Sequence, residues 1–197
     1  MMEAFGISTL VVALAEIGDK TQLLALALTL RYRTPWPVAA GILVATLANH
    51  AVAGAVGAAV AAHVDPDWMR WILGLSFIAM GLWVLVPDKL DDDDTPKATA
   101  RGAFLATTLT FFVVEIGDKT QIATVALAAD YTPLIMVIVG TTLGMMIANL
   151  PVVFLGERIA RAIPLGPVRK AAAALLIVLG GLALVGDAAS FGLNGPG

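Results

Sequence analysis

The sequence contains no cysteine and only two histidines. The missing cysteines exclude disulfide bonds and thiolate metal sites. Charge is also sparse, because Asp, Glu, Lys and Arg together make up 14% of the residues. The net charge of −3 comes largely from one acidic run, Asp91–Asp94, so it indicates neither acidic nor basic partners, and nothing in the composition supports nucleic-acid binding.

Apolar residues are abundant: they account for 59% of the chain, and the mean hydropathy is +0.89. Such values are typical of a membrane protein. A helix needs about 20 apolar residues to cross a hydrocarbon layer about 30 Å thick. Suitable stretches predict an all-α membrane protein with six transmembrane helices, near Ala4–Leu30, Pro37–Ala62, Trp68–Val86, Gly102–Ala129, Pro133–Leu155 and Val168–Val185.

The first apolar segment could be mistaken for a secretory signal peptide, because it contains the cleavage-like tripeptide Ala13-Leu14-Ala15. A signal peptide requires a basic leading region, and Met1, Met2 and Glu3 provide none. We therefore expect this segment to be retained as a helix.

Prolines lie mostly near the expected helix boundaries, where a missing N–H is harmless. Pro35, Pro66 and Pro133 occupy such positions. Pro151 differs because it lies inside the fifth segment. Together with Asn149 it predicts a local break, which a membrane helix tolerates where protein or a cavity satisfies the freed carbonyl.

The two halves of the chain are related by an internal duplication. With Glu16 aligned on Glu115, the heptapeptide Glu-Ile-Gly-Asp-Lys-Thr-Gln coincides with an identical copy, and Arg70 coincides with Arg169. Each half contains three predicted helices, an odd number, so the second half enters the membrane from the opposite side. We therefore predict two inverted three-helix repeats, residues 1–87 and 102–197, joined by an acidic cytoplasmic linker at 88–101.

The loop charges predict the orientation. Lysine and arginine gather on one side of the predicted membrane, whereas Arg70 alone lies on the other. By the positive-inside rule the first side is cytoplasmic, which places both termini outside. The residues on that side are Arg31, Arg33, Lys89, Lys97, Arg101, Arg158, Arg161, Arg169 and Lys170.

The duplicated heptapeptide places carboxylates where hydrocarbon would surround them. A charged side chain at the bilayer centre costs about 2.5–3.5 kcal/mol, so such residues mark an ion or substrate path. In a continuous helix the Glu, Asp and Gln of each copy share one face. Oxygen ligands of this kind suit a hard divalent cation such as Ca²⁺ or Mn²⁺. They come from Glu16, Asp19, Gln22, Glu115, Asp118 and Gln121.

Other residues of the two halves are candidates for lining this site. Each lysine follows a Glu by four residues, which favours an intrahelical ion pair. It could also snorkel towards an interface, or replace the cation in an empty site, which is the role we favour. The motif glycines, Gly18 and Gly117, permit close helix approach or local unwinding. The candidate lining residues are Lys20, Thr21, Gln22, Asn49, Lys119, Thr120, Gln121 and Asn149.

Two E-x-G-D-[KR]-[TS] motifs in a six-helix inverted repeat resemble a family of cation transporters shared by bacteria, plastids and the Golgi. That family includes manganese exporters and calcium or manganese/proton exchangers. Both copies match in full, over 16–21 and 115–120, and the resemblance covers nearly the whole chain. It implies that the cation is bound by Glu16, Asp19, Glu115 and Asp118.

The resemblance also implies a transporter and not an enzyme, with a divalent cation and protons as substrates, the lipid bilayer as surroundings and no resident cofactor. The long N-terminal extension of eukaryotic members is absent, which implies a bacterial inner-membrane protein. The family does not decide between Mn²⁺ and Ca²⁺, and the sequence does not give the oligomeric state.

We expect a secondary antiporter that exports a divalent cation, with Mn²⁺ favoured over Ca²⁺, in exchange for protons. Closely spaced carboxylates cannot all stay ionised without a cation, so protons and metal compete for one site. One alternative is a cation channel with the same carboxylates as a selectivity ring. Another is an intramembrane metal-dependent lipid-phosphate hydrolase, although phosphate handling would want arginine or a glycine-rich anion cradle. A purely structural salt-bridge scaffold leaves the duplicated charges unexplained.

Overall fold

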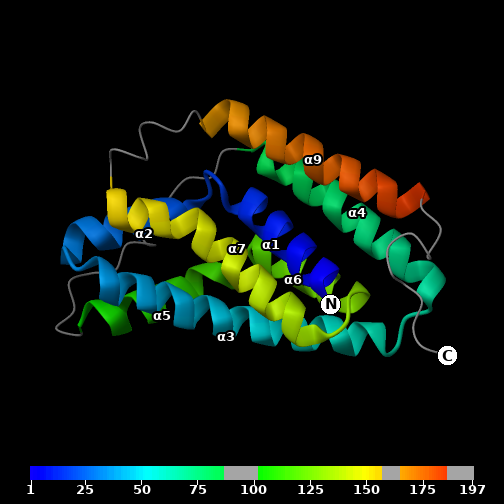
Figure 1. Ribbon diagram of the computed structural model, residues 1–197, viewed down its shortest axis with the longest axis horizontal. Helices are drawn as coiled ribbons and strands as arrows, with labels where there is room; N and C mark the ends of the chain where they lie inside the picture. Colours follow the sequence, from blue (N-terminus) through cyan, green and yellow to red (C-terminus); the bar gives the residue numbers. More distant parts are fainter. Residues whose placement is uncertain (87–101, 157–164, 186–197) are drawn as a thin grey trace.

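The computed structural model describes residues 1–86, 102–156 and 165–185, which form eight helices and no strand (Figure 1). The all-α prediction is therefore confirmed for the described part of the chain. The predicted linker at 88–101, with Asp91–Asp94, lies outside the described residues, as do Arg158 and Arg161. In chain order the helices are α1 (Met2–Glu16), α2 (Lys20–Tyr32), α3 (Pro35–Ala61), α4 (Pro66–Val84), α5 (Ala103–Glu115), α6 (Lys119–Asp130), α7 (Leu134–Leu155) and α9 (Leu165–Val185).

Within the described residues, three helices are long and apolar enough to cross a membrane: α3, α7 and the Gly166–Val185 part of α9. Shorter apolar helices cover Trp68–Val84 and Ala103–Glu115. Large apolar side chains lie exposed on the surfaces of these helices, including Leu47 and Ile147. An apolar exterior of this kind fits a surface whose solvent is lipid, as expected of a membrane protein.

The prediction of single unbroken helices at Ala4–Leu30 and Gly102–Ala129 is wrong. Each segment is interrupted in the middle of its motif, at residues 17–19 and 116–118. Gly18 and Gly117 both have φ +78°, a conformation that glycine adopts at little cost and other residues rarely adopt. The alternative of local unwinding at these glycines is therefore confirmed.

The break predicted at Pro151 is also wrong. The helix α7 continues through this proline to Leu155, and its end is closed by a bond from the Gly156 N–H to the Val152 carbonyl. Proline removes one backbone donor, and a membrane helix tolerates that loss when its neighbours compensate.

Glycines set the closest helix contacts. A Cβ at Gly140 in α7 would lie 2.6 Å from the Phe5 carbonyl oxygen in α1, and one at Gly41 in α3 would lie 2.8 Å from the Phe104 carbonyl oxygen in α5. Gly41 and Gly140 are equivalent when Glu16 is aligned on Glu115. The broken helix of each half therefore packs through a glycine on the long helix of the other half.

The helices α4 and α9 form an antiparallel pair along one edge of the molecule, and α3 and α5 run along the opposite edge (Figure 1). Gly74 of α4 lies against Leu184 of α9, whereas Gly81 lies against Ile177, so the two helices run in opposite directions. In the space between the two edges lie α1, α6 and α7 (Figure 1). The two helices of the pair contact different partners: α4 packs on α6, and α9 packs on α1.

Replacing Gly140 by valine should lower the thermal stability of the purified protein, because the added side chain would collide with the α1 backbone. Overpacking of this kind costs about 1–3 kcal/mol. The matched control is Gly6→Val in α1, since a Cβ at Gly6 meets no atom within 4 Å among residues 1–86, 102–156 and 165–185. Thermal unfolding in detergent measures both variants, and equal melting temperatures would contradict the close α1–α7 packing.

Candidate metal centre

The two breaks place all four motif carboxylates inside the protein. Glu16 and Glu115 are the last residues of α1 and α5, and Asp19 and Asp118 are the N-cap residues of α2 and α6. All four side chains are at most 5% exposed. The expectation that Glu, Asp and Gln share one helix face is wrong, because the helix ends between them.

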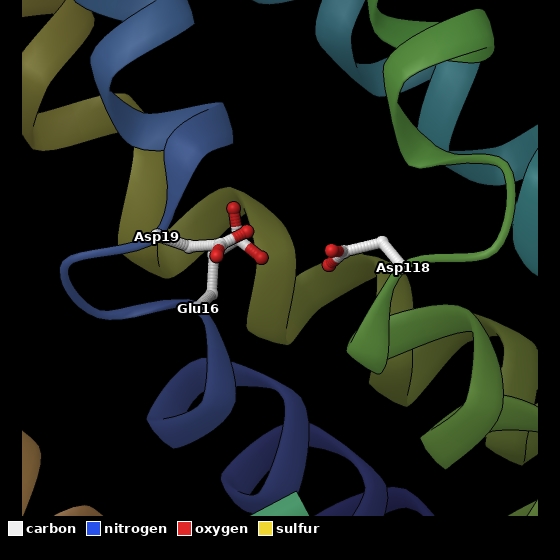
Figure 2. Close-up of side chains that lie close together, drawn as sticks. All are labelled: Glu16, Asp19 and Asp118. Atoms are coloured by element: carbon white, nitrogen blue, oxygen red, sulfur yellow. The ribbon is translucent and has the colours of Figure 1, made fainter. Parts of the chain in front are cut away.

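Three of these carboxylates come together. Glu16, Asp19 and Asp118 can each offer one oxygen such that all three oxygens lie within 4.8 Å of one another. Figure 2 shows Glu16 and Asp19 reaching in from the two sides of the first break, while Asp118 points toward them from the second break. Oxygens on opposite sides of a Ca²⁺ ion lie about 5 Å apart, so this spacing fits one divalent cation. Glu115 does not belong to this group.

Several carboxylate oxygens in the centre have no hydrogen-bond partner among the described residues, although they are buried: Glu16 Oε2, Glu115 Oε1 and Asp118 Oδ2. Burying an unsatisfied anionic acceptor is costly, and a bound cation or a proton removes that cost. The donor set is carboxylate oxygen, which suits a hard divalent cation.

The lysines connect the two halves. Lys119, which is 2% exposed, forms an ion pair with Asp19, and Lys20 Nζ lies 3.8 Å from Asp118 Oδ1. The predicted intrahelical Glu–Lys geometry is wrong, because each break separates the Glu from the Lys and turns the lysine toward the aspartate of the other half. These two ion pairs hold the first break against the second.

The glutamines and threonines mainly support the breaks. The Gly18 N–H donates to Gln22 Oε1 at 3.1 Å, and the Gly117 N–H donates to Gln121 Oε1 at 2.7 Å. Thr21 Oγ1 donates to Asp19 Oδ2 and Thr120 Oγ1 donates to Glu115 Oε2, each at 3.2 Å. The glutamine oxygens therefore bond the glycine N–H groups, and the threonines orient carboxylates.

Only one of the two candidate asparagines bonds to a carboxylate in this conformation. Asn149 Nδ2 donates to Glu16 Oε1 at 3.1 Å. Asn49 Nδ2 donates instead to the Phe112 carbonyl at 3.1 Å. Asn149 therefore contacts the carboxylate cluster, whereas Asn49 bonds the backbone of α5, and a role of either residue in cation binding stays a prediction.

Sequence reasoning gave Arg169 no role in the site and used it only for the duplication and the orientation. Its Nη2 donates to the Gly18 carbonyl at 3.0 Å, inside the first break. The alignment of Arg169 with Arg70 was the available signal, because few charged residues recur in both halves.

Comparison with known proteins adds a family match. The model of the family described as "Divalent cation/proton antiporter GDT1" matches residues 4–92 and 103–190, which includes both motifs. No solved structure matches the chain.

The names of similar proteins fit this family. The "Putative manganese exporter" of Vibrio cholerae is 52% identical over 180 residues, which cover 91% of this chain and 89% of that protein. "GDT1-like protein 5" of Arabidopsis thaliana is 29% identical over 76% of this chain and 79% of its own length. "GDT1-like protein sll0615" of Synechocystis is 29% identical over 66% of this chain and 72% of its own length.

Replacing Gly117 by alanine should lower the stability by about 1–2 kcal/mol, because alanine would have to adopt φ +78°. A Cβ there meets no atom within 4 Å in the part of the chain that the structure describes, so the loss reports backbone strain and not a collision. The control is Gly181→Ala in α9, also in open space, where alanine should stabilise the helix by about 0.5–1 kcal/mol. Thermal unfolding of both variants tests this, and a stabilising Gly117→Ala would contradict the break.

Proposed function

The chain belongs to the GDT1 family of divalent cation/proton antiporters, and we propose that it exports Mn²⁺ from the cytoplasm in exchange for protons. The family consists of transporters, which contradicts the lipid-phosphate hydrolase alternative. The name of the Vibrio cholerae relative supports Mn²⁺ as the cargo. The observation that carries the proposal is the group of three buried carboxylates, Glu16, Asp19 and Asp118, assembled from both motifs. Ca²⁺ is the second candidate cargo, because it takes the same oxygen ligands.

The proposed cation ligands in this conformation are Glu16, Asp19 and Asp118, with Asn149 orienting Glu16. The sequence symmetry explains where Glu115 enters. When the halves exchange roles, Asp19 and Asp118 replace each other and Glu115 takes the place of Glu16. Both aspartates then stay with the cation throughout the cycle, while the two glutamates bind it alternately.

Charge balance supports exchange with protons. The two motifs contain four carboxylates and two lysines, which leaves an excess of two negative charges when all are ionised. One divalent cation or two protons neutralise that excess, so either can stabilise the centre. Moving two charges outward against 100 mV costs about 4.6 kcal/mol, and two protons moving inward offset that cost. We propose two protons for each cation.

The lysines complete this account. Asp19 cannot give its full charge to a cation while it also pairs with Lys119, so metal binding competes with that ion pair. The same competition acts between Lys20 and Asp118. Each lysine then serves as the counter-charge of an aspartate when the cation has left.

The membrane topology of the proposal has six crossings in two inverted repeats, residues 1–87 and 102–197. In it, α1 with α2 and α5 with α6 each make one broken crossing, as in transporters whose site lies at mid-membrane. The identical φ of Gly18 and Gly117 and the equivalent α1–α7 and α5–α3 contacts support the repeat. The positive-inside rule supports termini outside a bacterial inner membrane, with the linker in the cytoplasm.

Neutralising one ligand should weaken Mn²⁺ binding and transport by about tenfold or more, because fewer ligand charges lower the affinity of such sites. Asp118→Asn and Glu16→Gln keep the size of the side chain and remove one charge. Glu3→Gln is the control, since Glu3 lies exposed near the start of α1. Calorimetric titration in detergent and uptake into proteoliposomes measure the effects, and wild-type transport by either site variant would exclude that residue as a ligand.

Proton coupling makes a separate prediction. Because protons and metal share the carboxylates, Mn²⁺ affinity should fall as the pH is lowered, and Mn²⁺ binding should release protons to the buffer. In proteoliposomes an imposed pH gradient should drive uphill Mn²⁺ accumulation, and a proton ionophore should abolish it. Mn²⁺ flux that changes neither with the imposed pH gradient nor with the ionophore would favour the channel alternative over the antiporter.

A further inference from the structure

The first break is closed by a side chain from α9. Arg169 Nη2 donates to the Gly18 carbonyl, and an added Cβ at Gly18 would lie 3.0 Å from the same nitrogen. The guanidinium therefore lies directly against the glycine, and Gly18 is buried. A carbonyl at a helix interruption lacks its usual intrahelical donor, so a charged donor there has a large effect.

The equivalent position in the other half is open. Gly117 is exposed, and a Cβ there would meet no atom of the described residues within 4 Å. Its counterpart arginine, Arg70, lies with its guanidinium carbon 5.9 Å from the centre of the Trp71 ring. Arg70 Nε is buried without a hydrogen-bond partner among the described residues. Two identical heptapeptides thus have different surroundings, one closed by an arginine and one not.

Other contacts show the same asymmetry. Gln22 Nε2 donates to the Ala148 carbonyl at 2.9 Å, which fastens the first break to α7, and Asn149 bonds Glu16 there. Asn49 bonds the backbone of α5 and not Glu115. The contacts of the α4–α9 pair are asymmetric too. The sequence repeat relates α4 to α9 and α2 to α6, so the equivalent of the α4–α6 contact would be α9 on α2, whereas α9 packs on α1.

We propose that Arg169 and Arg70 are alternating positioning residues of the transport cycle: Arg169 holds the Gly18 carbonyl in this conformation, and Arg70 holds the Gly117 carbonyl in the opposite one. The inference rests on the proposed inverted-repeat antiporter. Neither arginine touches the cation. Each fixes the break of one half, and with it the glutamate that precedes that break, while the other break opens. Movement of the α4–α9 pair exchanges the two contacts.

Hydrogen–deuterium exchange tests this in the full-length protein in nanodiscs. The segments 16–22 and 115–121 have the same sequence, so their intrinsic exchange rates are closely matched. In the native protein 115–121 should exchange faster. Arg169→Gln should speed exchange in 16–22 by about tenfold and slow it in 115–121, because a bond from a charged donor is lost from one state only. Arg70→Gln should have the reverse effect, with slower exchange in 16–22 and faster exchange in 115–121.

Matched controls separate this role from a merely structural one. Lys170→Gln removes the neighbouring exposed charge on α9 and should leave both segments unchanged. Arg169→Lys keeps the charge and should shift exchange less than Arg169→Gln. If Arg169→Gln does not fold, Arg70→Gln alone decides, since it must slow exchange in 16–22. Changes of the same sign in both segments, or no change in either, would overturn the proposal.

The same samples report on the proposed function independently. Mn²⁺ titration of the native protein in the same nanodiscs tests the carboxylate site. Loss of the expected Mn²⁺ binding with reciprocal exchange intact would reject the cargo and leave the arginine pair standing. Intact Mn²⁺ binding without reciprocal exchange would reject the arginine pair and leave the antiporter standing.

Discussion

The dipoles of four helix ends meet between the two breaks, and this electrostatic arrangement organises the centre. Asp19 and Asp118 lie at the N-terminal ends of α2 and α6, where the positive end of the helix dipole stabilises a carboxylate. Glu16 and Glu115 lie at the C-terminal ends of α1 and α5, where the dipole opposes a negative charge. The dipoles therefore favour a negative charge at the two aspartates and oppose one at the two glutamates. In the proposed cycle, this difference places the exchange of cation and proton at the glutamates.

Close packing between the halves brings these ends together. Glycine at 41 and 140 lets the broken helix of one half approach the long helix of the other, and the ion pairs of Lys119 and Lys20 then cross between the breaks. A longer separation would leave each aspartate without its lysine. The cost of isolated charge in a low-dielectric interior is several kcal/mol, so packing and electrostatics depend on each other here.

The sequence predicted the extents of α3 and α7 well, because hydropathy encodes them directly. It also contains the duplicated carboxylates, whose role as cation ligands stays a prediction. It failed on helix continuity because glycine has two opposite uses in this chain. Gly140 lies within a continuous helix and permits close packing, whereas Gly18 takes φ +78° and ends one. The distinguishing signal was the aspartate that follows Gly18, a residue suited to capping the next helix. The cross-pairing of the lysines had no local signal, since it depends on how the halves meet.

Two identical heptapeptides adopt the same backbone and yet have unequal neighbours. The motif sequence cannot be the cause of that inequality, so it arises from residues that flank the repeat and from the position of α4 and α9. If the two motifs exchanged their surroundings, each would still have the same sequence. The free-energy difference between the present arrangement and the exchanged one therefore comes from the flanking residues alone. A transporter needs such a difference to be only a few kcal/mol, so that a cation or a proton can shift the populations. In the proposed cycle, duplication keeps the two arrangements similar in free energy, because only the flanking residues distinguish them.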